Sequence, residues 1–471
     1  MTTECKQESF PFQACYQREV VARFDGGEIT SDGGVLLLRE VEKRRGIIGQ
    51  FACCFRDWRD ADYIEHSVEE LIGQRVYGLA LGYEDLNDHE DLRRDSLLAA
   101  VVGKEDPTGS DRRERDAGKP LAGKSTLNRL ELTPAQAGAQ ARYKKIEVDP
   151  EAVDRFFVDV FIQAHRKAPA QIVLDVDCTD DVLHGNQEGK FFHGYYMNYC
   201  YLPLYIFCGD FLLCARLRRS NMDASAGTVE ELERIVKQIR KAWPQIKIVI
   251  RGDSGFAREQ IMTWCEQNHV DYVLGLAKNE RLKQVLEPQM EQAEQQWRQT
   301  GKAARVFADF DYQTLDSWSR SRRVVGKAEH LDQGSNPRFV VTSLRSTRLG
   351  AQKLYEKLYC ARGEMENRIK EQQLDLFADR TSTATMRANQ LRLWLSSVAY
   401  VLMNELRRLG LRATILAQAQ CQTIRLKLLK IGAQIKISVR RIFVSLATGY
   451  PYEAIFSTVH ANLQRFSVLR I

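Results

Sequence analysis

The sequence predicts a mixed α/β fold, because strand-like and helix-like patterns alternate through its middle part. Apolar runs rich in β-branched and aromatic residues predict strands at 171–178, 199–208, 211–218, 246–252 and 270–276. Amphipathic patterns predict helices at 226–243 and 257–268. The composition, with 44% hydrophobic and 28% charged residues, is that of an ordinary globular protein, and the length suggests two to four domains.

The order of these elements specifies the fold more closely. Three neighbouring strands, then helix, strand, helix and strand, is the order of an RNase H-like core with a mixed five-stranded sheet. Residues 280–345 interrupt this core, and polar loops there separate strand-like runs at 304–312, 319–326 and 338–344. The sequence therefore predicts a β-rich insertion, after which helices resume at 350–375 and 384–410.

The first 165 residues are expected to be mainly helical after a short glycine-rich opening. Apolar residues recur at helical spacing after the glycine pair at 33–34 and again at 68–76. A polar loop follows at 103–124, and Ser125 is placed to cap the next short helix.

The remaining boundaries follow from the core and from charge. We expect the core to occupy 166–279 and 346–410, on either side of the insertion, and a basic helical region to occupy 411–471. From Glu405 onward the chain has eleven Lys and Arg against two Glu, an excess of nine positive charges, whereas the whole chain has a net charge of +6. Such a segment suits a DNA backbone, although a solvated amphipathic helix would have the same composition.

Three acidic residues lie where the predicted elements would bind ligands. Asp177 ends the first predicted strand and Asp253 follows the fourth, and strand ends in open α/β sheets are where ligands bind. Glu366 lies on a predicted helix much later in the chain. Two strand-end aspartates and a helix-borne glutamate can hold two Mg²⁺ ions, which activate water or a 3′-hydroxyl for phosphoryl transfer.

Each acid also has a competitor or a simpler explanation. Asp175 faces the same side of the strand as Asp177, because side chains alternate along a strand, and we expect it to support Asp177. Asp253 could simply cap a turn. Glu364 is two residues from Glu366 and is expected to point elsewhere on the helix as a solvated charge.

The segments that carry these acids resemble a known family. Tyr359-x2-Arg362-x3-Glu366 is similar to the Y-x2-R-x3-E part of the signature of DDE transposases from bacterial insertion sequences, and its residues share one helix face. The segments 251–256 and 177–179 resemble the second and first aspartate segments of the same family. With the stretches 30–34, 82–85 and 125–131, they resemble the insertion-sequence family numbered thirteen-eighty.

The resemblance implies a function and a set of site residues. It implies a transposase that binds the terminal inverted repeats of its element, cleaves the DNA ends and transfers the strands to target DNA. Asp177, Asp253 and Glu366 would hold two Mg²⁺ ions, for which Mn²⁺ can substitute. The helical N-terminal region would bind DNA, and pairing of the two DNA ends implies a homodimer.

Further DNA contacts are expected from four residues, Tyr359, Arg362, Lys370 and Trp318. The family's lysine falls at position 373, which is Gln373 here, and Lys370 lies one helical turn from the glutamate and could substitute. Trp318 could stack on a flipped base or pack inside the insertion.

Two alternatives remain open at this point. The chain could be a catalytically degenerate transposase that only grips DNA, or a metal-dependent nuclease without strand transfer. The intact acid triad argues against the first, whereas Gln373 mildly favours it.

Other patterns in the sequence give only weak signals of a bound ligand or of location. Residues 118–125 fit the phosphate-binding pattern G-x4-G-K-[ST], but the preceding segment is too highly charged to be a buried strand, so no nucleotide cofactor is expected. His184 and His193 give a weak zinc signal without a nearby third ligand. The start of the chain lacks the apolar region of a signal peptide, and no run of 18 apolar residues occurs, which predicts a cytosolic protein. The family resemblance implies the bacterial cytoplasm, with association to the nucleoid when bound to DNA.

Overall fold

The computed structural model describes residues 9–135 and 137–465, and the expectation about the first residues of the chain lies outside them. Contacts divide the chain into two units. We call residues up to 147 together with those from 398 onward the terminal unit, and residues 148–397 the central unit. The predicted mixed α/β fold with a mixed sheet is confirmed.

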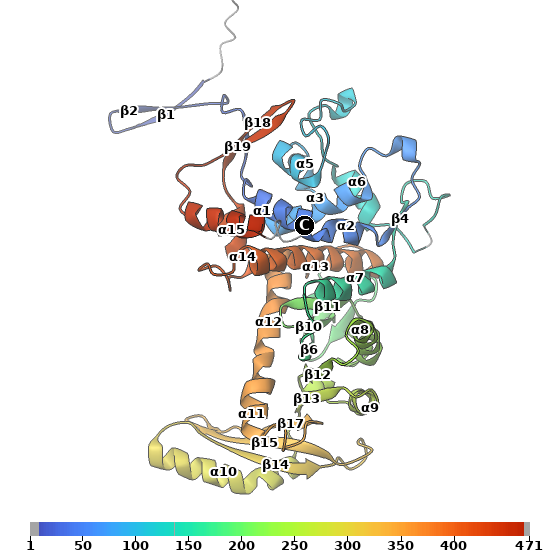
Figure 1. The fold of residues 1–471 in the computed structure, drawn as a ribbon, viewed down its shortest axis with the longest axis vertical. Helices are drawn as coiled ribbons and strands as arrows, with labels where there is room; N and C mark the ends of the chain where they lie inside the picture. Colours follow the sequence, from blue (N-terminus) through green and yellow to red (C-terminus); the bar gives the residue numbers. More distant parts are fainter. Residues whose placement is uncertain (1–8, 136, 466–471) are drawn as a thin grey trace, which may run out of the picture. The chain divides into compact units, whose positions relative to one another are not determined.

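The central unit is built on one large sheet with the strand order β11-β10-β6-β12-β13-β17-β15-β14 (Figure 1). β6, β12 and β13 are parallel, whereas β10 and β11 are antiparallel to β6. The strands occupy β6 (Gln171–Cys178), β10 (Leu204–Cys208), β11 (Phe211–Arg216), β12 (Lys247–Gly252), β13 (Asp271–Leu276), β14 (Ala304–Tyr312), β15 (Arg322–Leu331), β16 (Gly334–Ser335) and β17 (Arg338–Thr342).

Helices cover both faces of this sheet, which is why its central strands are continuous apolar runs. One face packs against α7 (Pro150–Gln163), α8 (Thr228–Ala242), α9 (Glu259–Gln267) and α10 (Glu280–Thr300). The other face packs against the π-helical turn η4 (Leu354–Tyr359). Leu174 and Val176 belong to the first face, so the alternating Asp175 and Asp177 belong to the face covered by η4.

The insertion differs from its prediction at its start. Residues 280–300, expected as polar loop, form the long helix α10, whose Leu282 and Leu286 are buried. The strands that follow extend the core sheet, because β17 pairs with β13 and with β15.

A small sheet with the order β7-β9-β8 interrupts the core between β6 and β10. Its strands are β7 (Asp181–Val182), β8 (Phe191–His193) and β9 (Asn198–Tyr201). The sequence predicted one strand at 199–208, whereas the structure has β9 and β10 separated at Leu202 and Pro203. Proline cannot donate to a strand ladder, which explains the break.

The segment that carries Glu366 is helical but irregular. After η4 it continues as the 3-10 turn η5 (Cys360–Arg362), α12 (Gly363–Lys370) and the π-helical turn η6 (Glu371–Asp375), and it is preceded by α11 (Ala351–Lys353). In Figure 1, α11 and α12 run along one side of the strands, and α8 and α9 lie on the other.

The terminal unit combines helices with short sheets. Its helices are α1 (Val35–Arg45), α2 (Ile47–Ala52), α3 (Val68–Leu81), α4 (His89–Leu92), α5 (Ser96–Val102), α6 (Lys124–Glu131), α14 (Cys421–Ile424) and α15 (Glu453–Arg465), and α13 spans Met386–Leu409. Its strands are β1 (Ser9–Cys15), β2 (Arg18–Arg23), β3 (Glu28–Thr30), β4 (Phe55–Asp57), β18 (Ala433–Ser438) and β19 (Arg441–Leu446), and β5 (Ile146–Val148) pairs with β4. The strands β18 and β19 lie where the sequence predicted only helix.

Two sequence segments that carried the family resemblance hold this unit together. Asp32 accepts a hydrogen bond from the Tyr83 hydroxyl at 2.7 Å and pairs with Lys430 at 2.8 Å. A Cβ at Gly34 would lie 1.8 Å from the Leu428 carbonyl oxygen, so only glycine fits this approach. Within the described residues, no helix combines the length and apolar character needed to cross a membrane.

Candidate active site

The two strand-end aspartates lie at the same edge of the sheet. β6 and β12 are parallel neighbours, so their carboxyl ends, with Asp177 and Asp253, meet there. Asp177 is buried and accepts a hydrogen bond from the backbone N–H of Cys178 at 2.9 Å. Asp253 caps a short 3-10 turn by accepting from the backbone N–H of Gly255 at 2.8 Å.

A single guanidinium joins the third acid to the first. Arg362 Nη1 lies 2.9 Å from Asp177 Oδ2, and Arg362 Nη2 lies 2.6 Å from Glu366 Oε1. The Glu366 side chain is 45% exposed, so its carboxylate is open to solvent or ligand. Strand and helix carboxylates far apart in sequence are therefore brought onto one cation.

The electrostatics of Asp177 reflect its crowded surroundings. The pKa of Asp177 is raised to about 7, chiefly by burial and also by the neighbouring carboxylates of Asp253 and Glu366, whereas Arg362 and the Cys178 N–H act in the opposite direction. The three acids are thus close enough to repel one another, which is the condition under which added positive charge is stabilised.

The carboxylates supply the all-oxygen ligands that Mg²⁺ prefers. Within residues 9–135 and 137–465, however, no three His, Cys, Asp or Glu side chains converge closely enough to hold a metal ion together, and this includes His184 and His193. The Arg362 bridge occupies Asp177 and Glu366 instead. The three carboxylates are of the kind that binds divalent ions, and such an ion would offset their mutual repulsion. For it to bind, Arg362 would have to release at least one carboxylate.

Asp175 and Asp177 have different side-chain partners. It forms a buried ion pair with Arg251, at 2.5 Å from Nε and 2.7 Å from Nη2. Burial raises the pKa of Asp175 even though Arg251 favours its charged form. Arg251 Nη1 also donates to the Leu358 carbonyl at 2.5 Å, so the pair ties β6 and β12 to the helical segment.

Sequence reasoning missed this role of Arg251. An arginine inside an apolar strand, directly before Gly252-Asp253, was the available signal, because a buried charge is nearly always paired.

Tyr359 fixes the same segment against β13. A Cβ at Gly275 would lie 2.5 Å from the Tyr359 hydroxyl oxygen and 2.9 Å from the backbone nitrogen of Ser254. Burial raises the pKa of Tyr359, and the nearby Asp253 carboxylate adds to that effect. The tyrosine therefore packs over a glycine directly beside the Asp253 turn.

Lys370 and Gln373, which lie near and at the family's lysine position, differ from each other in their surroundings. Lys370 is exposed at the end of α12. Gln373 donates to the backbone carbonyl of Asp180 at 3.0 Å and to Asp181 Oδ1 at 2.8 Å. Gln373 thus holds the turn that follows Asp177, and Asp181 is fully buried.

Trp318 is not exposed as the sequence interpretation required for stacking on a base. It is 5% exposed, belongs to the main core and lies edge-on to Tyr312 with ring centroids 5.8 Å apart. The guanidinium of Arg322 lies 5.5 Å from its ring centroid and pairs with Glu259 and Glu266. The expectation of an exposed tryptophan is wrong, and the packing alternative agrees with the structure.

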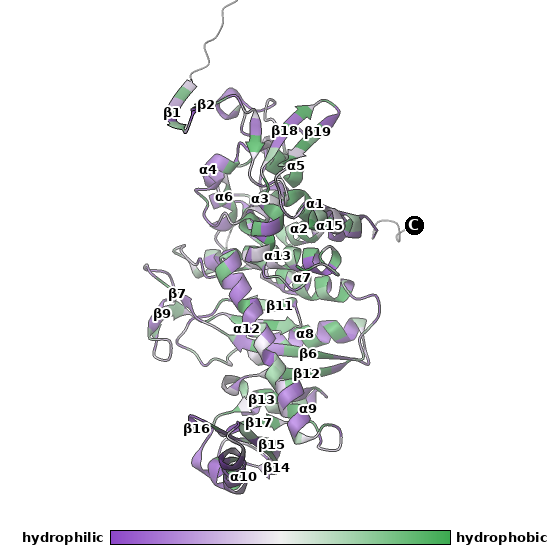
Figure 2. Ribbon diagram, turned by 90° about the vertical axis from the view of Figure 1, so that its left-hand side faces the viewer, coloured by the Kyte–Doolittle hydropathy of each residue, from purple (hydrophilic) through white to green (hydrophobic). Residues whose placement is uncertain are grey.

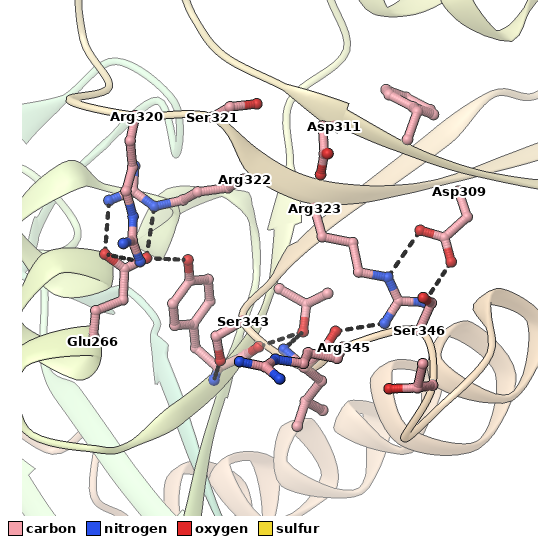
Figure 3. A pocket seen from close by; sticks show the side chains of 15 residues that line it. Glu266, Asp309, Asp311, Arg320, Ser321, Arg322, Arg323, Ser343, Arg345 and Ser346 are labelled. Carbon is pink, nitrogen blue, oxygen red and sulfur yellow. Dashed lines mark hydrogen bonds and ion pairs between the residues drawn. The ribbon is translucent and has the colours of Figure 1, made fainter.

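Two of the cavities among the described residues of the central unit lie near these elements. One of about 740 Å³ lies beside Arg322, and its arginines are largely paired with acids, as Arg320 and Arg322 are with Glu266 (Figure 3). The other, of about 290 Å³, lies beside Ser254. It is lined by Tyr355 and Tyr359 and by two cations, Lys278 and Arg338.

The segment 118–125 leads into α6 without the surroundings of a nucleotide-binding loop. The residues before it form a 3-10 turn (Glu114–Asp116) and irregular backbone. The backbone N–H of Lys124, at the start of α6, is already bound by Glu90 Oε1 at 2.8 Å.

Comparison with known proteins shows the family of this chain. It matches the family model described as transposase DDE domain group 1 over residues 12–468. No curated protein matches it. Among solved structures it is similar to a piggyBac transposase synaptic complex with hairpin DNA, at 11% identity and a TM-score of 0.39, over 85% of this chain and 80% of that one. Since the family model covers nearly the whole chain, the protein belongs to the transposase DDE domain group 1 family.

Proposed function

We propose that this transposase cleaves the ends of its element and transfers them to target DNA, with Asp177, Asp253 and Glu366 as the ligands of two Mg²⁺ ions. The observation that carries the proposal is the Arg362 bridge between Asp177 and Glu366. It brings a strand-end carboxylate and a helix-borne carboxylate to one place at the edge of the sheet, where Asp253 also lies.

The strand order supports an RNase H-like core. β11-β10-β6-β12-β13 has an antiparallel meander of three strands followed by two strands parallel to β6. This is the order that the sequence predicted for such a core, and the two aspartates lie at the ends of the first and fourth of these strands in chain order.

The side chains have separate tasks in this scheme. Bound divalent ions would polarise the attacking water or 3′-hydroxyl and offset charge on the leaving oxygen. Asp177 must be ionised to serve as a ligand. Arg362, released from a carboxylate, has the planar fork that binds a phosphate by two hydrogen bonds. Asp175 and Arg251 hold the helix in register with the strands.

The surface beside the acids suits DNA. The cavity next to Ser254 combines two tyrosines with Lys278 and Arg338, and such mixtures of rings and cations bind nucleic-acid strands. The remaining details follow the family resemblance. They are binding of terminal inverted repeats, a homodimer that pairs two ends, membership of the thirteen-eighty group, and action in the bacterial cytoplasm.

The test is end cleavage by an Asp253→Asn variant on DNA that carries the element's ends. The amide keeps the size of the side chain but loses the charge that holds a hard cation, so Mg²⁺-dependent cleavage should fall below detection while end binding persists. Asp316→Asn, an exposed loop aspartate of the same unit, is the matched control and should cleave normally. Near-normal cleavage by Asp253→Asn would assign the metal to other residues.

Strand transfer from pre-cleaved ends separates the two alternatives. A nuclease without transfer would cut ends but fail to join pre-cleaved ends to target DNA. A degenerate DNA-binding protein would do neither and would still bind the ends.

A further inference from the structure

The small sheet β7-β9-β8 projects from the place where Asp177 lies. β6 ends at Cys178, and Leu204, the first residue of β10, pairs with Cys178 in the sheet register. The intervening residues therefore leave and re-enter the core at the carboxyl end of β6. Figure 2 shows β7 and β9 projecting from the central unit at that level.

Aromatic rings are displayed on this segment. Three of them form what we call the aromatic platform, with exposures of 50% for Phe192, 84% for Tyr195 and 50% for Tyr199. Phe192 and Tyr199 are cross-strand neighbours in β8 and β9, with ring centroids 5.5 Å apart. Large rings gathered on a solvated surface are uncommon without a partner and mark an interaction site.

The backbone beneath the platform is held in place by the core. Ser220 donates to the Phe191 carbonyl at 3.0 Å, and the Tyr201 hydroxyl donates to the Glu188 carbonyl at 2.5 Å. Glu188 N–H in turn donates to the Ala384 carbonyl at 2.9 Å. The rings therefore stand on a fixed framework, so little conformational entropy is lost when a ligand stacks on them.

Cations are interleaved with the rings. The ammonium of Lys190 lies 4.7 Å from the Tyr199 ring centroid. The side chain of Arg219 packs against Gly189, where a Cβ would lie 3.1 Å from its Cγ. The Glu188 carboxylate is turned away to accept from the Met386 backbone N–H at 3.1 Å. Rings with cations between them suit the bases and phosphates of a nucleic-acid strand.

We propose that the aromatic platform stacks unpaired nucleotides of the DNA strand that enters or leaves the Asp177 site. The inference rests on the proposed function for the identity of the strand, since the segment that carries the platform leaves the core at the end of β6, directly after Asp177. Stacking on rings is tolerant of base identity, so the platform would hold a frayed end whatever its sequence. Trp318, buried in the core, cannot serve as such a surface without unfolding its surroundings.

Binding of fluorescein-labelled oligothymidylate to the full chain tests the platform. The measurement is fluorescence anisotropy in EDTA, so that no cleavage takes place. Tyr195→Ala and Phe192→Ala should each weaken binding by about 5- to 100-fold, the effect of removing one stacking ring. Tyr195→Phe should keep most of the affinity, because a phenyl ring still stacks. Binding of blunt duplex DNA should change little.

Met197→Asn is the matched control. Met197 lies on the same projecting segment, at a backbone φ of 54°, a conformation that Asn adopts readily, and it carries no ring. The Met197→Asn variant should bind oligothymidylate with the same affinity as the unaltered chain.

Three outcomes would overturn the proposal. The first is unchanged oligothymidylate affinity in both alanine variants, and the second is an equal loss of blunt-duplex binding. The third is a change in self-association of the DNA-free variants in sedimentation, which would assign the rings to contact with a second copy of the chain. Failure of the proposed function would appear separately, as absence of Mg²⁺-dependent cleavage by the unaltered chain.

Discussion

Asp177 shows how a buried acid can favour ligand binding at the expense of stability. Its carboxyl group is enclosed between the end of β6 and Arg362, near two further carboxylates. In the absence of metal, ionising it is therefore unfavourable in the folded chain, where its pKa is about 7, against an ordinary value of 3.8. A cation bound at the site would reverse that preference.

The raised pKa of Asp177 predicts a pH-dependent stability. Between the unfolded pKa near 4 and the folded pKa near 7, the folded chain binds more protons, so this group lowers the free energy of unfolding as pH rises. Asp177→Asn removes the effect and should stabilise the metal-free chain at pH 8 by up to about 4 kcal/mol, at about 1.4 kcal/mol per pKa unit. Chemical denaturation in EDTA at pH 8 and pH 4 measures it. The gain should disappear at pH 4, and an equal gain at both pH values would contradict the account.

Trp318 is predicted to act through packing. Trp318→Ala should lower the free energy of unfolding by about 3–5 kcal/mol, as expected for a buried aromatic side chain, and should impair every step of DNA processing together. Trp318→Phe should recover part of the loss. Leu315→Ala, at an exposed position nearby, is the control for thermal melting and should leave stability unchanged. Selective loss of one processing step at normal stability would restore a direct DNA role.

At the scale of elements, the segment carrying Glu366 is positioned by three contacts with three strands. Arg362 binds Asp177 at the end of β6, Arg251 of β12 binds the Leu358 carbonyl, and Tyr359 packs over Gly275 of β13. The π-helical turn η4 lies among these contacts, and such turns are frequent at functional sites.

Gly275→Ala should disturb this packing. The new Cβ would lie 2.5 Å from the Tyr359 hydroxyl, and the overpacking should cost about 1–3 kcal/mol of stability and reduce cleavage. Adding Tyr359→Phe removes the nearest atom and should restore part of the stability, although the Ser254 backbone stays close. Gly350→Ala, with open space around the site of its Cβ, is the control. Additive losses in the double variant, measured by urea unfolding, would show that the two residues do not interact.

The sequence predicts the core strands well because each is a short apolar run with clear ends. The prediction at 171–178 coincides with β6, and that at 246–252 differs from β12 by one residue. α10 was missed because it is mostly polar and carries Pro288, although its buried Leu282 and Leu286 lie at helical spacing. The acids could be proposed from their places at strand ends, whereas the tie from Arg251 to Leu358 depends on tertiary contacts that no local pattern encodes.

At the scale of the whole molecule, part of the positive charge after Glu405 is buried or paired inside the fold. Of the basic residues after Glu405, Arg407 and Arg425 are buried and donate to backbone carbonyls, and Lys430 pairs with Asp32. The excess of positive charge therefore overstates what this region can offer to DNA phosphates.

The segment 118–125 gives a prediction at the same scale. Lys124→Ala should weaken DNA binding modestly, reducing the salt dependence by about one phosphate contact, and no step should require ATP. Lys241→Ala, an exposed lysine of the central unit, is the control. Binding measured over a range of salt concentrations, with and without ATP, checks both parts. Saturable ATP binding that Lys124→Ala abolishes would show that the segment is a nucleotide site after all.

The terminal unit is assembled from both ends of the described chain, and this has a consequence for synthesis. β3 completes its sheet only with β18, and α3 receives the Arg425 side chain at the carbonyls of Leu79 and Ala80. A ribosome that has made everything up to residue 397 has produced the whole central unit, but the terminal unit still lacks its second segment, from residue 398 onward. The terminal unit is therefore begun first in synthesis but completed last. A nascent or truncated chain contains Asp177, Asp253 and Glu366 before it contains a complete terminal unit.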